Sequence, residues 1–253
     1  MNLFFGFKNE MFNSELTIPR FQNCDKADLK YNLYQIKIDS NKWIIENLEN
    51  CILNNDFYLI KNEMLDNNKI FFLATESESS KFDNNKIIDL NNFTETIPAF
   101  RANLKVYISN GGFSSYQSEY PYRMIAKKGN ILTPTSSILN KHADKNYLIF
   151  KNIYQEPIQK KFYAYFVDIK NKKLLEKFEM KTNYSNFLNI NKLLIKPEIY
   201  IMTDGFLGIP IFLSEHNKHL SLEHTHPAHE YFLSKNKYEQ VSKLKKEIYE
   251  IIN

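Results

Sequence analysis

The chain has 253 residues, 43% of them hydrophobic, which is enough for one large domain or two small ones with a packed core. Its formal net charge is only +4, and lysine and glutamate are mixed along the sequence, so the composition argues against a basic patch for nucleic acid. No apolar run approaches the length needed to cross a bilayer, and the short apolar start lacks the pattern of a signal peptide, so we expect a soluble cytoplasmic protein without membrane contact.

The first part of the chain combines strand and helix patterns. Apolar and polar residues alternate around Ile36, which predicts a strand. Between residues 43 and 53 the apolar residues recur at helical spacing, which predicts a short helix. Residues 57–61 and 70–74 are rich in β-formers and are separated by an Asp-Asn-Asn turn, so we expect them to form a hairpin. Together these elements predict a small mixed α+β unit over residues 1–85.

A polar region separates this unit from the rest of the chain. Residues 75–85 are rich in Ser and Glu, and a second polar, Asn-rich stretch precedes Pro98. These features are typical of a linker and place an approximate boundary between residues 76 and 100. The alternative, with similar weight, is a single domain in which this region is a long surface loop.

From about residue 101 onward, short β-rich runs alternate with turn residues. The expected strands are residues 104–109, 147–152, 162–170, 173–181, 198–203, 209–214 and 220–225. A turn at residues 169–173 joins two of them as a hairpin, and Asp204-Gly205 joins another pair. This spacing is typical of a sandwich or a barrel. We expect a mainly β fold, with an antiparallel β-sandwich, Ig-like or jelly-roll-like, over residues 86–253.

The last part of the chain has the pattern of an amphipathic helix. Its apolar stripe recurs at steps of three and four residues and consists of Tyr238, Val241, Leu244, Ile248 and Ile252. Lysines and glutamates occupy the other face. We therefore expect a C-terminal helix that packs on the sheet or against the N-terminal unit.

The two cysteines, Cys24 and Cys51, show neither metal-binding nor redox spacing. Two cysteines in a chain of this length are typical of reduced thiols. We expect both to be free in the native protein.

Residues 215–230 have the highest concentration of histidine and glutamate side chains in the chain, with five of its six histidines. His224 and His226 lie two residues apart, so in a strand their side chains share one face, and Glu230 can return from the next turn. Imidazole and carboxylate together suit a divalent transition metal such as zinc, iron, manganese or nickel. The candidates for a general base beside that ion, or for a group that orients its ligands, are His229, Glu223 and His219.

The pattern His224-x-His226-x-x-x-Glu230 is similar to the first metal motif of the cupin family, and the resemblance implies a metal centre. It covers only these residues. The cupin pattern has a glycine six residues before the first histidine, where this chain has Lys218, and a second histidine motif downstream, where this chain has only a helix. We therefore assign the chain to no family. The alternative interpretation is a polar turn in which Pro227 ends the strand.

Residues 109–123 form the second candidate stretch. Two adjacent glycines allow backbone conformations closed to other residues, and hydroxyls, an amide, a carboxylate, tyrosines and an arginine follow them. Such groups suit a polar ligand, because rings stack on a sugar and arginine pairs with an acid. The alternative is a tight turn with half-buried strand tyrosines. The candidate ligand-binding residues are Asn110, Gly111, Gly112, Ser115, Tyr116, Gln117, Glu119, Tyr120, Tyr122 and Arg123.

Three functions fit these features. The first is a β-sandwich protein with a polar ligand-binding or interaction surface, whose ligand is a sugar-like or acidic small molecule. The second is a metal-dependent enzyme that uses the His/Glu cluster at residues 215–230. The third is a structural subunit of a homo-oligomer. Whether the two candidate stretches meet in space, and whether they share a pocket, discriminates between these hypotheses.

Overall fold

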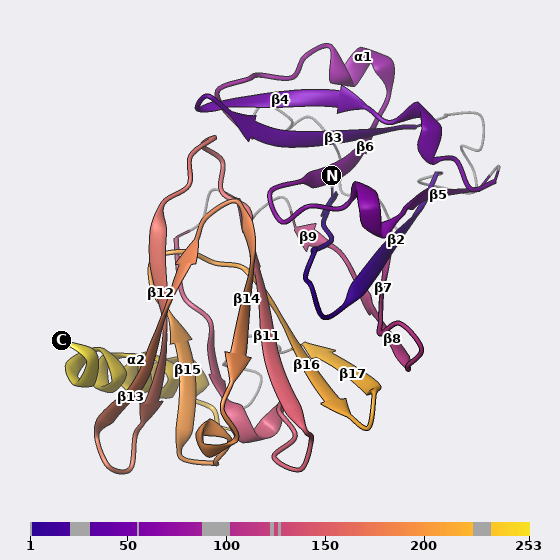
Figure 1. The fold of residues 1–253 in the computed structure, drawn as a ribbon. Coiled ribbons are helices and arrows are strands. Elements are labelled where there is room, and N and C mark those ends of the chain that lie inside the picture. Colours follow the sequence, from indigo (N-terminus) through magenta and orange to yellow (C-terminus); the bar gives the residue numbers. More distant parts are fainter. Residues whose placement is uncertain are drawn as a thin grey trace.

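The computed structural model of the chain describes residues 2–20, 31–54, 56–87, 102–121, 124–125, 128–224 and 234–253. Antiparallel strands form four sheets, and a helix ends the chain (Figure 1). The expected fold class, mainly β with a C-terminal helix, is confirmed. Within the described residues, no helix is long and apolar enough to cross a membrane.

Two four-stranded sheets face each other and form the sandwich of the C-terminal part. The outer sheet has the order β10 (Leu132–Pro134), β15 (Ile199–Thr203), β12 (Lys161–Asp168) and β13 (Lys173–Lys181). The middle sheet has the order β14 (Tyr184–Ile190), β11 (Lys145–Asn152), β16 (Ile209–His216) and β17 (His219–His224). Alternate residues of these strands fill the space between the sheets, among them Leu148, Phe150, Phe166, Ile201 and Phe212.

The C-terminal helix α2 (Lys237–Ile252) covers the far face of the outer sheet (Figure 1). Its buried residues Val241 and Ile248 pack with Tyr165, Val167 and Met202. The apolar stripe at helical spacing therefore predicts both the helix and its packing on a sheet, and both are confirmed.

Two further sheets form the N-terminal part. One has the order β4 (Lys42–Asn47), β3 (Asn32–Asp39), β6 (Ile70–Ala74), β1 (Asn2–Phe4) and β9 (Tyr120–Pro121). The other has the order β5 (Phe57–Ile60), β2 (Asn13–Pro19), β7 (Asn103–Tyr107) and β8 (Phe113–Gln117). Both sheets combine strands from before and after residue 85.

The short helical elements are α1 (Glu76–Ser79) and the 3-10 turns η2 (Glu49–Cys51), η3 (Asn62–Met64), η6 (Thr135–Ser137) and η7 (Lys192–Leu194). The cap of α1 is a reciprocal one, because the Thr75 hydroxyl accepts from Glu78 N–H and the Glu78 carboxylate accepts from Thr75 N–H. Cys51 is a buried free thiol at the end of η2, while Cys24 lies outside the described residues.

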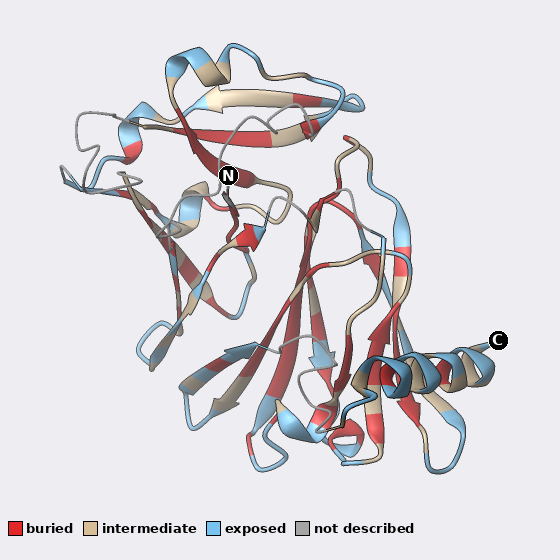
Figure 2. Ribbon diagram, turned by 180° about the vertical axis from the view of Figure 1, so that it is seen from behind, coloured by how far each residue is buried: buried red, intermediate tan, exposed pale blue. Residues whose placement is uncertain are grey.

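The middle sheet is buried on both faces. Leu148 and Phe150 of β11 point to the outer sheet, whereas Tyr147 and Ile149 join the core of the N-terminal sheets. The Tyr147 ring, for example, meets Phe12 edge to face with centroids 5.2 Å apart. Figure 2 shows buried residues in the strands of the middle sheet and in the strands of the neighbouring sheets. One continuous apolar core therefore spans the N-terminal sheets and the middle sheet.

Three sequence predictions are wrong. Residues 43–53 hold strand β4 and a 3-10 turn instead of a helix, because Ser40 and Asn41 take positive φ of 49° and 60° and close a two-residue hairpin with β3. β5 and β6 do not form a hairpin, since β5 pairs with β2 and β6 with β3 and β1. The third wrong prediction is the hairpin at Asp204-Gly205. Gly205 has the expected positive φ, but β15 before it belongs to the outer sheet and β16 after it belongs to the middle sheet, so the two strands do not pair.

Candidate functional site

The two stretches that the sequence singles out meet in space. Strand β8 lies along β17, although the two belong to different sheets. At one end, Gly112 N–H donates to Lys218 O at 2.7 Å, and farther along, Leu222 N–H donates to the Ser114 hydroxyl at 3.2 Å. At the other end, the rings of Tyr116 and His224 are in contact. The stretches form a seam between the N-terminal part and the middle sheet.

The Gly-Gly pair is explained by this seam. A Cβ on Gly111 would lie 3.0 Å from Lys218 O, and one on Gly112 would lie 3.1 Å from both Lys218 O and His219 Cα. These neighbours are backbone atoms and cannot rotate away. The glycines therefore permit the close approach of two hairpins, which is a packing role.

The other candidate ligand-binding residues are spread over different environments. Ser115, Tyr116 and Gln117 line a shallow hollow of about 330 Å³ together with Ala102 and Asn103. Burial and the charge of Glu119 raise the pKa of Tyr116 to about 12. Asn110 has a φ of 60° at the tip of the β7–β8 hairpin. Tyr122 and Arg123 lie outside the described residues.

Tyr120 is a correction to the candidate set. It is fully buried, and its hydroxyl lies 3.2 Å from Ile153 O and 3.1 Å from Leu207 O. A side chain enclosed in this way serves the core, so its place on a ligand-binding surface is wrong.

Two of the clustered histidines belong to the β16–β17 turn. His216 pairs with His219 across it, and Asn217 and Lys218 take the positive φ of 49° and 63° that a two-residue turn requires. The His216 Nδ1 atom lies 3.5 Å from Asp144 Oδ2. A hydrogen bond of 2.8 Å from Asn217 N–H to the same oxygen, assisted by His216, lowers the pKa of Asp144. These contacts hold the turn.

Of the three predicted metal ligands, the structure places only His224, the last residue of β17. His224 is a described residue, whereas His226, Glu230 and the candidate base His229 lie outside the described residues. Glu223 and His224 point to opposite faces, because Glu223 pairs with Phe212 and His224 with Ile211. Within the described ranges, no group of three His, Cys, Asp or Glu residues is placed to hold a metal ion.

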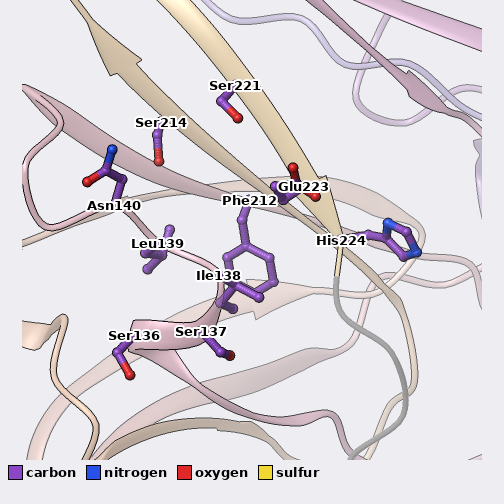
Figure 3. Close-up of a pocket in the computed structure, with 10 residues that line it drawn as sticks. All are labelled: Ser136, Ser137, Ile138, Leu139, Asn140, Phe212, Ser214, Ser221, Glu223 and His224. Atoms are coloured by element: carbon purple, nitrogen blue, oxygen red, sulfur yellow. The ribbon is translucent and has the colours of Figure 1, made fainter. Parts of the chain in front are cut away.

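A larger hollow lies on the other face of β17 and is called the serine groove below. It has a volume of about 500 Å³ and runs between η6 with its following turn and strands β16 and β17 (Figure 3). Its lining residues are Ser136, Ser137, Ile138, Leu139, Asn140, Phe212, Ser214, Ser221, Glu223 and His224. His224 lies at its edge and points away from the other lining side chains (Figure 3).

Strand register builds the upper wall of the serine groove. Ser214 faces Ser221 and Phe212 faces Glu223 across the β16–β17 pair, so these four side chains share one face. The lower wall is anchored by Thr135, whose hydroxyl donates to Leu194 O at 2.7 Å. The walls are therefore held by the sheet and by the start of η6.

Two serines of the serine groove have already committed their hydroxyl protons. Ser137 donates its hydroxyl proton to Pro134 O at 2.8 Å, and Ser214 donates its own to Asn146 Oδ1 at 2.7 Å. Each hydroxyl oxygen keeps lone pairs for another partner. Glu223 is exposed, and no other described residue forms an ion pair or hydrogen bond with its carboxylate. Phe212, Ile138 and Leu139 supply apolar surface beneath these groups.

Of these lining residues, only Glu223 and His224 are predicted from the sequence as functional residues. A signal was present in the expected strands, where Phe212-x-Ser214 and Ser221-x-Glu223 place polar side chains on one face. Residues 136–140 carry no comparable pattern, because the tertiary fold brings them to this face.

Comparison of the chain with models of protein families, with curated proteins and with solved structures finds no match.

Proposed function

We propose that this protein binds a small polyhydroxylated molecule in the serine groove. The observation that carries the proposal is the gathering of four serines, Asn140 and Glu223 around one hollow of about 500 Å³. This volume is within the range of small-molecule pockets, which combine apolar walls with a few convergent polar groups. Sugars and sugar alcohols have matching chemistry, with apolar C–H faces and several hydroxyl groups.

The same chemistry argues against an acidic ligand at this place. Of the described residues that line the groove, none is a lysine or an arginine, while Glu223 carries a negative charge. A carboxylate ligand would meet repulsion without a compensating cation. The sugar-like ligand is therefore the better proposal of the two that the sequence suggests.

Titration calorimetry with glucose, sorbitol, the amine glucamine and the acid gluconate tests the proposal. We expect saturable binding of at least one of them to the wild-type chain. Ser221→Phe places a ring in the groove at an exposed strand position, where phenylalanine is well accepted, and should abolish binding without lowering the melting temperature.

Ser115→Phe is the matched variant for the second hollow and should leave binding intact, since that hollow lies on β7 and β8. Loss of binding in Ser115→Phe with retention in Ser221→Phe would assign the ligand to the second hollow and contradict the proposal. So would the absence of binding for all four compounds.

A further inference from the structure

We infer that the ligand of the serine groove carries a protonated amine, which Glu223 recognises. This inference rests on the proposed function and names the class of ligand: a hydroxylated primary amine, in preference to a neutral or an acidic polyol. It depends on the count of donors and acceptors around the groove and on the charge of its lining.

The first argument concerns the hydrogen bonds that the lining already makes. Ser137 and Ser214 donate their hydroxyl protons to Pro134 O and Asn146 Oδ1, so both present oxygen lone pairs to a ligand. Asn140 Oδ1 accepts from His142 N–H at 2.9 Å, which leaves the amide nitrogen of Asn140 as a donor. The two engaged serines and the Glu223 carboxylate favour a ligand group rich in hydrogen-bond donors, and an ammonium group offers three donors and no acceptor.

The second argument is the charge of Glu223. Two other carboxylates beside the β16–β17 hairpin are paired: Glu215 lies 3.8 Å from Lys145 Nζ, and Asp144 lies 3.5 Å from His216 Nδ1. Glu223 forms no such pair with any residue in the described part of the chain, although the chain holds 33 lysines and arginines. A carboxylate at the rim of a groove whose described lining has no lysine or arginine complements a cation.

The third argument is position. Glu223 stands opposite Phe212 on the face shared with Ser214 and Ser221, so its carboxylate belongs to the same strand wall as their hydroxyls (Figure 3). An ammonium group bound to the carboxylate would place the hydroxyls of the same ligand along the serines. The apolar residues Ile138 and Leu139 would contact its carbon chain.

Glucamine, sorbitol and gluconate test the inference because they share one carbon skeleton and differ in charge. At pH 7 we expect glucamine to bind about fivefold more tightly than sorbitol, which corresponds to the upper end for one exposed ion pair, and gluconate to bind most weakly. Added salt should weaken the binding of glucamine and leave that of sorbitol unchanged.

Glu223→Gln should remove the preference for glucamine while changing sorbitol binding less than about twofold, because glutamine keeps the size and loses the charge. Glu250→Gln is the matched control, since it removes one exposed carboxylate from α2, and it should keep the preference.

Equal affinities for glucamine and sorbitol in the wild-type chain, or tightest binding of gluconate, would overturn the inference and leave the proposed function standing. Absence of binding for all three compounds and for glucose would instead overturn the proposed function. The order of affinities in the wild-type chain distinguishes these outcomes even where a variant fails to fold.

Discussion

The imidazole ring of His224 lies against the phenol ring of Tyr116, with centroids 5.5 Å apart and planes tilted by 57°. One ring comes from the histidine-rich stretch and the other from the glycine- and tyrosine-rich stretch. Their contact joins the two regions of highest chemical density in a packing interaction. Both stretches therefore have a structural role where β8 meets β17, and the serine groove lies on the other face of β17.

The close approach of the hairpins makes Gly112 sensitive to substitution. In Gly112→Ala the new Cβ would lie 3.1 Å from two backbone atoms of the facing turn. We expect the variant to lose about 1–3 kcal/mol of unfolding free energy through overpacking. Urea titration measures the loss, with Ser115→Ala at an exposed position of the following strand β8 as the control. An unchanged midpoint for Gly112→Ala would show that the turn moves freely.

The proposed function requires no metal ion, so we expect the purified protein to carry no stoichiometric metal and its melting temperature to be indifferent to EDTA. Elemental analysis is the measurement. The contrary result would be a wild-type protein that carries stoichiometric metal. If His224→Ala and His226→Ala each lose that metal and His216→Ala keeps it, the result would support the metal-dependent enzyme. Such metal should also dissociate below about pH 6.5, where histidine becomes protonated.

Lys151 makes stability depend on pH. It is fully buried, and its Nζ atom donates to Asn67 O at 3.1 Å and Lys69 O at 3.3 Å. Burial lowers the pKa of Lys151 from 10.5 to about 7, although the charge of Asp66 opposes this shift. Between these two values the unfolded chain binds the extra proton, so the free energy of unfolding should rise with pH across this window by up to about 1.4 kcal/mol per pH unit.

Lys151→Met should flatten that slope, because methionine does not titrate. Urea titrations between about pH 7 and pH 9.5 provide the measurement, a window below the ordinary lysine value. Lys161→Met replaces a lysine that is exposed and paired with Glu179, and it should keep the slope of the wild-type chain. Identical slopes for Lys151→Met and the wild-type chain would mean that Lys151 stays charged in the fold.

The C-terminal helix contributes to the stability of the outer sheet. Ile248 is fully buried against that sheet, so Ile248→Ala should cost about 2–5 kcal/mol through lost burial and the cavity it leaves. Lys243→Ala, on the exposed side of the same helix, should change stability by less than about 0.5 kcal/mol. Thermal unfolding of the two variants compares them directly. Equal melting temperatures would indicate that α2 is dispensable.

Local patterns in the sequence predict several elements of this fold and fail at others for identifiable reasons. β11, β12 and α2 are predicted because their apolar residues recur at the period of a strand or a helix. β4 is missed because Trp43, Ile44 and Ile45 form a helical spacing together with Leu48 and Ile52, and only the Ser40-Asn41 turn decides between strand and helix. The pairing of β5 with β2 depends on contacts across the fold, which no local pattern records.

The residues of the candidate site also divide into those that local patterns indicate and those that only the tertiary fold brings together. Glu223 is identified by its place in a dense stretch, and Ser214 and Ser221 are readable from strand alternation. Ser136 and Asn140 reach the groove because η6 is tied to η7 through Thr135, whose hydroxyl donates to Leu194 O. Sequence reasoning therefore singles out Glu223 and His224 on the strand wall, leaves Ser214 and Ser221 beside them unnamed, and misses the opposite wall.

The two-sided burial of the middle sheet also bears on the order in which the chain reaches its native state. β1 pairs with β9, and Gly6 O accepts a hydrogen bond from the Ser185 hydroxyl at 2.9 Å, across 179 positions of the sequence. β1 can pair early with β6, whereas its pairing with β9 and the contact between Gly6 and Ser185 form only after those later segments have been made. Pairing between such distant segments is slow and exposes apolar strands in the meantime. We expect the nascent chain to depend on chaperone protection until β11 is available, and the N-terminal sheets to become stable together with the sandwich instead of before it.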